Sequence, residues 1–171
     1  MSTKNVRIAE LSVFTAIAFI FSYLESLIPL PIPFPGIKLG LANLVILIVL
    51  YRDGFASAFG VSMVRNVLNA LTFGSLFGLL YSLAGSILSL LVMTALYRTK
   101  HFKFPWISIS CIGAILHNMG QFAVASALVG RGAILHYFPF LYFSGLIAGC
   151  LIGVLSMLCI QRLPRLQISN R

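Results

Sequence analysis

Residues 29 to 43 read Pro-Leu-Pro-Ile-Pro-Phe-Pro-Gly-Ile-Lys-Leu-Gly-Leu-Ala-Asn and separate the first apolar run of the chain from the second. Each proline fixes φ and removes a backbone donor, so neither a helix interior nor a central strand accepts a proline at every second position. The stretch is therefore predicted to be a stiff, polyproline-like connection. Because its other residues are apolar, it either links two helices rigidly or folds back as a lid over a pocket.

The composition around this stretch indicates a membrane protein. Of the 171 residues, 60% are hydrophobic and only 9% are charged, and the mean hydropathy is +1.03. Most of the surface must therefore face lipid rather than water. The formal net charge of +9 might indicate a nucleic-acid partner, but the basic residues occupy short gaps between apolar runs and form no stripe. No nucleic acid is expected.

Six apolar runs predict an all-α integral membrane protein with six transmembrane helices. A bilayer requires about 20 helical residues per span. The first run resembles a signal peptide, but its hydrophobicity continues, so we interpret it as an uncleaved span. The second run is short and ends in the turn-forming sequence Tyr-Arg-Asp-Gly. The predicted spans cover approximately residues 8–28, 39–51, 55–71, 74–97, 106–129 and 136–160 of one transmembrane domain, 1–171.

The lysine and arginine residues predict the orientation, because cytoplasmic loops of membrane proteins carry an excess of them. With the N-terminus inside, Lys38 and Arg131 lie outside and Arg65 falls within a span. The remaining nine of the twelve lie inside: Lys4, Arg7, Arg52, Arg98, Lys100, Lys103, Arg162, Arg165 and Arg171. We therefore expect a multi-pass protein of the cytoplasmic membrane with both termini in the cytoplasm and the proline-rich stretch on the outer face.

Small residues at helical spacing predict where helices approach closely, because lipid provides no hydrophobic drive for helix association. Two long faces favour packing inside the bundle: Gly74, Gly78, Ser82 and Ser86 in the fourth span, and Gly145, Gly149 and Gly153 in the sixth. The first span has a shorter face with Ser12 and Ala16. That face fits docking on a partner as well as it fits internal packing.

Polar residues inside the spans mark a candidate binding site. An arginine at a helix centre costs about 2.5 to 3.5 kcal/mol on insertion scales and is seldom kept without a partner or a task. Arg65 and Asn69 share one helix face, and so do His117 and Gln121, because four residues make about one turn. The predicted substrate-binding residues are Lys38, Asn43, Arg65, Asn69, His117, Asn118 and Gln121, and the predicted lid residues are Pro31, Pro33, Pro35 and Gly36.

The same polar residues have a structural alternative. Hydrogen bonds between helices would each contribute about 0.6 to 2 kcal/mol and would fix the bundle. Arg65 needs either a ligand or a structural partner, and Glu25 is the one carboxylate near it in the predicted arrangement. Because two clusters and Lys38 converge at one depth, we favour a ligand pocket. Nearly all charge on the outer side is positive, so the expected ligand is anionic or polar and neutral.

Several kinds of chemistry are excluded by the residues that the chain lacks. It has no glycine-rich phosphate loop of the Walker type and only one aspartate, so no paired aspartate motif exists to hold Mg²⁺ on a diphosphate. Its three cysteines have no metal or redox spacing. We expect no catalytic residue, no metal site and no cofactor. The chain is interpreted as a binding or conducting subunit rather than an enzyme.

The runs Pro35-Gly-Ile-Lys-Leu-Gly-Leu-Ala-Asn43 and Arg65-Asn-Val-Leu-Asn69 resemble the Gx transporter family, which is also labelled heptaprenyl diphosphate synthase component I. The resemblance covers essentially the whole chain. In fold, this family is similar to the substrate-binding S components of energy-coupling factor transporters. The resemblance implies a six-helix bundle, an outward-facing pocket capped by the loop after the first helix, and a docking face at Ser12 and Ala16. The implied partners are a transmembrane coupling subunit and ATPase subunits.

Two functions therefore remain open. The first is a solute-binding subunit of an uptake system, which needs a ligand-sized cavity in the outer half. The second is a non-catalytic membrane subunit that anchors a prenyl-diphosphate or quinone-pathway enzyme, or a membrane redox assembly. An anchor needs only packed helices and a cytoplasmic surface that fits its partner.

Overall fold

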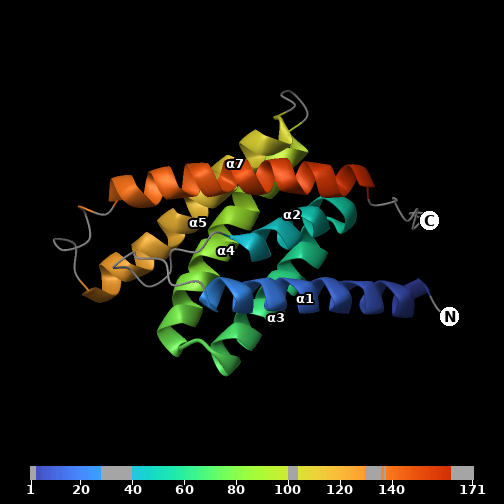
Figure 1. The fold of residues 1–171 in the computed structure, drawn as a ribbon, viewed down its shortest axis with the longest axis horizontal. Helices are drawn as coiled ribbons and strands as arrows, with labels where there is room; N and C mark the ends of the chain where they lie inside the picture. The colour runs from blue at the N-terminus through green and yellow to red at the C-terminus, as the bar shows by residue number, and fades with distance from the viewer. Residues whose placement is uncertain (1–2, 28–39, 100–103, 130–135, 137, 163–171) are drawn as a thin grey trace.

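The computed structural model describes residues 3–27, 40–99, 104–129, 136 and 138–162, and the regular structure in this part of the chain is all helical, with no strand (Figure 1). Six helices follow one another in the described part: α1 (Thr3–Leu27), α2 (Leu41–Asp53), α3 (Phe55–Thr72), α4 (Leu76–Arg98), α5 (Trp106–Val129) and α7 (Phe138–Arg162). The predicted all-α class is confirmed for these residues. Five predicted site residues, Pro31, Pro33, Pro35, Gly36 and Lys38, lie outside them.

The lengths of the helices indicate a multi-pass membrane protein. Four of them are long and apolar enough to cross a bilayer: α1 from Lys4, α4, α5 as far as Leu128, and α7. The helix α2 has only 13 residues. At 1.5 Å per residue it is about 20 Å long, less than the hydrocarbon core of about 30 Å. That all six helices span the membrane stays a prediction.

The first residues of α1 and the last residues of α7 lie at the same end of the molecule (Figure 1). The connection between α2 and α3 lies at this end as well. A chain that crosses a membrane an even number of times has both ends on the same side, and this arrangement agrees with that. Which side of the membrane this end occupies stays a prediction from the distribution of lysine and arginine.

The short helix α2 is the buried centre of the fold. Each residue from Val45 to Leu50 is at most 5% exposed. A helix that is apolar on every side must be covered on every side, and α2 packs against α1, α3 and α7. At its end Gly54, with φ of 81°, caps both α2 and α3. Glycine adopts this left-handed backbone at little steric cost, so one residue reverses the chain between the two helices.

The helices form two groups of three. The helices α1, α2 and α3 pack on one another and make the N-terminal half, whereas α5 packs on both α4 and α7 to make the C-terminal half. Contacts between α3 and α4 and between α2 and α7 join the two halves.

Glycines bring the backbones of the C-terminal half close together. A Cβ atom added at Gly149 would lie 2.6 Å from the Cα atom of Cys111, and one at Gly153 would lie 2.9 Å from that of Ile107. This confirms the predicted packing face of α7. Between α4 and α5, a Cβ at Gly120 would lie 2.8 Å from the Cα of Gly85. The close contact of α4 thus runs through Gly85 rather than along the predicted glycine and serine face.

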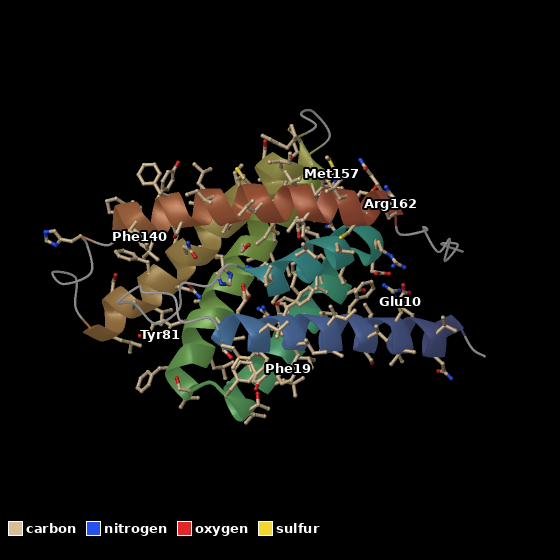
Figure 2. All side chains as sticks on the ribbon, in the orientation of Figure 1. Glu10, Phe19, Tyr81, Phe140, Met157 and Arg162 are labelled. Carbon is tan, nitrogen blue, oxygen red and sulfur yellow. The ribbon has the colours of Figure 1, made fainter. Side chains whose placement is uncertain are left out.

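The N-terminal half is held by side chains. Arg52 at the end of α2 forms an ion pair with Glu10 of α1, and its guanidinium lies 5.4 Å from the ring centroid of Phe14. Arg7 donates a hydrogen bond of 3.1 Å to the hydroxyl of Ser57 on α3. Figure 2 shows the side chain of Glu10 between α1 and the end of α2. These contacts connect all three helices at the end of the molecule that carries both chain termini.

Candidate functional site

A polar cavity lies where the two halves meet. Its volume is about 40 Å³. A water molecule needs about 10 to 15 Å³ by this measure, so in this conformation the cavity has room for a few waters. Helices of both halves contribute to the wall of the cavity. The polar side chains in this wall come from α1, α2, α3, α4 and α5.

Six of the seven predicted site residues line this one cavity: Asn43, Arg65, Asn69, His117, Asn118 and Gln121. Their spacing explains the arrangement, because residues four apart share a helix face. Arg65 and Asn69 enter from α3, while His117 and Gln121 enter from α5. The remaining residue, Lys38, lies outside the described part of the chain. The structure brings these six side chains together; that they bind a solute stays a prediction.

Arg65 is the most deeply buried cation of the site, with only 6% of its surface exposed. Its Nη2 atom donates a hydrogen bond of 2.7 Å to Asn66, and its Nη1 atom a longer one of 3.4 Å to Ser22. The amide of Asn66 in turn donates to Ser86 of α4 at 3.1 Å. Within the described residues, Nε of Arg65 has no hydrogen-bond partner. Neutral oxygens therefore hold both terminal nitrogens of the guanidinium, and Nε has no acceptor among the described residues.

Glu25 reaches the same cavity from α1 and is 7% exposed. Its Oε1 atom accepts a hydrogen bond of 2.7 Å from the backbone nitrogen of Leu41, the first residue of α2. A helix N-terminus has unpaired N–H groups and a partial positive charge, and the preceding residue, Gly40, has no side chain to cap them. Glu25 also interacts electrostatically with Arg65. The carboxylate therefore stabilises both the start of α2 and the buried guanidinium.

The helix α5 contributes three polar residues to the cavity wall: His117, Asn118 and Gln121. Asn118 donates a hydrogen bond of 2.9 Å to the carbonyl oxygen of Leu141, which ties α5 to α7. Asn69 faces it from α3, and its buried Oδ1 atom accepts no hydrogen bond from any described residue. A Cβ at position 85 would lie 3.1 Å from side-chain atoms of both His117 and Gln121. Glycine at this position on α4 leaves the room that these two side chains occupy.

Residues 14–159 match the family of heptaprenyl diphosphate synthase component I. The chain belongs to this family. The match covers every described residue of the cavity, from Ser22 on α1 to Ile152 on α7. No curated protein and no solved structure matches the chain significantly.

The matched region contains several cavity residues that were not predicted from the sequence to bind a ligand. The sequence predicts Glu25 only as a possible partner of Arg65, and it does not place Asn66 among the substrate-binding residues. Ser22 lies three residues before Glu25 on α1, so the two share a helix face. That spacing is the signal that could have found them. Ser82 was predicted to pack, and it lines the cavity instead.

The predicted docking residues, Ser12 and Ala16, are exposed on α1. The hydroxyl of Ser12 donates to the carbonyl oxygen of Ile8 in its own helix at 2.9 Å, so it presents no unpaired polar group. On the opposite face of α1, Ala18 and Ser22 are 0% and 1% exposed and belong to the packed interior. The face with Ser12 and Ala16 is thus available to a partner or to lipid, and its docking role stays a prediction.

No metal site is formed by the residues that the structure describes, because no group of three or more histidine, cysteine, aspartate or glutamate side chains comes together. Two thiols do meet: the sulfur atoms of Cys111 on α5 and Cys150 on α7 lie 3.1 Å apart. Experiments that introduce single cysteines must remove this pair first.

Proposed function

We propose that this protein is the solute-binding subunit of an uptake transporter of the energy-coupling factor type and binds a small anionic or polar solute in the polar cavity. One observation carries the proposal: Arg65 is buried where both halves meet and keeps a free Nε donor, with Asn69, His117 and Gln121 in the same wall. An exclusively structural arginine would be expected to use its donors within the bundle, because burying a charge is costly.

Solute entry requires the cavity to widen. Small-molecule sites usually enclose about 300 to 1,000 Å³, far more than the present cavity. We expect this widening at the seam between the two halves, because the helices there are joined mainly by side chains, whereas glycines bring backbones together within the C-terminal half. In the predicted orientation the cavity opens toward the outer face, where the proline-rich stretch with Pro31, Pro33, Pro35 and Gly36 would close it and Lys38 would add a positive charge.

Energy would come from separate subunits. The chain has no Walker motif, so ATPase subunits would act through a transmembrane coupling subunit docked on the α1 face with Ser12 and Ala16. A small-residue face allows close approach of a partner helix, which supports this position.

A second candidate function is an accessory membrane subunit of a prenyl-diphosphate or quinone-pathway enzyme, without catalytic residues of its own. The family description favours it, since the words component I imply a partner subunit and heptaprenyl diphosphate synthase names an enzyme. Such an anchor would need no bound solute, and its partner would be a soluble synthase.

Gentle extraction followed by native mass spectrometry separates the two candidates. A transporter subunit should retain a small molecule and co-purify with ATPase subunits. The retained mass should disappear in Gln121→Ala and persist in Thr72→Ala, because the Thr72 hydroxyl is exposed and bonded to Leu68 within α3. Co-purification with a soluble synthase, and no retained molecule, would instead establish the accessory role.

The orientation has its own test. Single cysteines at Ser2 or Ser169, in a background without the native thiols, should resist membrane-impermeant reagents in intact cells. Labelling at either position would place that terminus outside and contradict the predicted topology.

A further inference from the structure

A groove much larger than the polar cavity opens between α3 and α4. Its volume is about 650 Å³, and it shares Asn66, Asn69, Ser82 and Gln121 with the cavity. The two hollows therefore adjoin each other along these four residues. The groove alone falls within the range of about 300 to 1,000 Å³ that is usual for a small-molecule site.

The groove exists because the first turns of α4 lack bulky side chains on one face. Gly74, Gly78 and Ser82 follow one another at intervals of one turn along its wall. A Cβ at Gly78 would meet only the hydroxyl oxygen of Ser75, at 3.3 Å, so the space in front of it is open. Tyr81, labelled in Figure 2, belongs to the same wall. The predicted packing face of α4 thus borders a hollow over half of its length.

The polarity of the groove changes along it. Where it joins the cavity, the buried Oδ1 atom of Asn69 lacks a donor within the described residues, and Nε of Arg65 in the cavity wall lacks an acceptor there. The rest of the groove wall contains apolar residues such as Ala70, Phe73 and Leu79, together with Ser26, Ser75 and Tyr81. At its mouth Phe77 is 62% exposed, and the adjacent Leu76 is 73% exposed. In a membrane protein such exposed apolar residues face lipid.

We propose that the cavity and the groove together bind a single-chain amphiphile. Its polar head lies among Arg65, Asn69 and Gln121, and its apolar chain runs along Phe73, Phe77 and Leu79. We expect the head to donate as well as accept hydrogen bonds, because Nε of Arg65 lacks an acceptor and Oδ1 of Asn69 lacks a donor among the described residues. A hydroxyl and a phosphate monoester both meet this requirement. This inference rests on the proposed solute-binding function and specifies its substrate class.

Photolabelling in lipid nanodiscs of phosphatidylcholine tests the proposal with two probes, 1-dodecylglycerol and dodecyl phosphate, each carrying a diazirine near the end of its chain. Peptide mass spectrometry should place saturable labelling on the stretch from Phe73 to Leu79, and unlabelled probe should compete for it. Stronger labelling by dodecyl phosphate would indicate a phosphate head, and stronger labelling by 1-dodecylglycerol a hydroxyl head. Failure of both probes to label this stretch saturably would overturn the inference.

Two leucine substitutions provide a matched comparison. Gly78→Leu fills the groove and should lower saturable labelling about tenfold or more. Gly60→Leu on α3 serves as the control, because a Cβ there meets nothing within 4 Å, and it should label like the wild type. Equal labelling of both variants would show that the probe binds elsewhere and would contradict the assignment of the groove as the binding site. The labelled positions in the wild type test the inference independently if Gly78→Leu does not fold.

The inference and the proposed function can fail separately. If native mass spectrometry finds a retained small molecule that depends on Gln121 while neither amphiphile labels the groove, the solute-binding function stands and the amphiphile is excluded. If no small molecule is retained and a soluble synthase co-purifies, the function itself fails, and saturable labelling is then not expected either.

Discussion

The helices within each half of the molecule are held together by a different kind of contact. In the C-terminal half, glycines at 85, 120, 149 and 153 bring helix backbones so close that an added Cβ would meet backbone atoms at 2.6 to 2.9 Å. In the N-terminal half, the apolar side chains of α2 fill the centre, and polar contacts such as Arg52 with Glu10 connect the helices. Backbone contact allows one geometry only, whereas side chains can change rotamer. The C-terminal half therefore provides a rigid wall, and the N-terminal half an adjustable one.

This difference explains why the polar cavity lies at the seam. Side chains of the N-terminal half, Arg65 above all, approach a wall of α5 whose position is fixed by glycine contacts on both sides. Widening the cavity then means moving the N-terminal half, with little change inside the C-terminal one. We expect the two kinds of wall to respond differently to substitution.

The largest effect is expected from Gly149→Leu. Its side chain would have to push α5 and α7 apart, because the Cβ alone meets the Cα of Cys111 at 2.6 Å. We expect a loss of about 3 kcal/mol in stability or failure to fold, since overpacking a tight contact forces backbone shifts. Thermal unfolding in detergent, followed by size-exclusion chromatography, measures it against Gly60→Leu. Equal stability of the two variants would show that the C-terminal half is not rigid.

Arg65→Ala tests the adjustable wall. If Arg65 serves the solute, the variant should insert and remain about as stable as the wild type, while binding weakens by about 1.5 to 3 kcal/mol, the contribution of a hydrogen bond to a charged group. Binding is followed by native mass spectrometry of the retained molecule. If Arg65 is instead mainly a structural partner of Glu25, Arg65→Ala and Glu25→Gln should both be poorly folded in detergent, which would favour the bundle-fixing alternative.

Two alanines on α1 separate the packed face from the face proposed to dock. Ala18→Leu should lower stability by about 1 to 3 kcal/mol, because position 18 is 0% exposed. Ala16→Leu should leave thermal stability and ligand retention unchanged but abolish co-purification with the coupling subunit, since a bulky residue forces helix backbones apart. Unchanged co-purification for both Ala16→Leu and Ser12→Leu would remove the docking role from this face.

The smallest effects are expected at the polar end of the N-terminal half, just beyond the predicted span 39–51. Burial raises the pKa of Asp53 above the usual value of a carboxyl, although Arg52 opposes this. A carboxyl with a raised pKa binds its proton more tightly in the folded state, so stability decreases as pH rises through that pKa. Asp53→Asn should therefore raise the melting temperature slightly at neutral pH, and this gain should vanish below about pH 4, where the ordinary carboxyl is protonated as well.

Glu10→Gln should have the opposite effect on stability at the same end of the molecule. Its carboxylate pairs with Arg52, and the two side chains are 17% and 12% exposed. Removing the charge should lower stability by about 1 kcal/mol at neutral pH, the upper end for exposed ion pairs. A lower melting temperature for Asp53→Asn as well would mean that attraction to Arg52 outweighs burial at Asp53.

The spacing of polar residues predicted much of the candidate site, because it is a local property. Arg65 with Asn69, and His117 with Gln121, share faces through helical periodicity, and the structure directs both faces toward one cavity. The glycine face of α7 was predicted for the same reason. Gly78 on α4 had the same spacing yet borders a groove, since the packing of a small residue depends on which helix lies opposite it. No periodicity within one helix contains that information.

Composition and the six apolar runs determined by themselves that this is a helical membrane protein, because the balance between lipid and water depends on residue type alone. Only the tertiary structure decided that the short helix α2 is enclosed on all sides, that Glu25 caps its first turn, and that a groove of about 650 Å³ lies beside the polar cavity. These features depend on contacts between residues far apart in the chain. Such contacts arise from how whole helices pack, and the order of residues along one helix does not specify its neighbour.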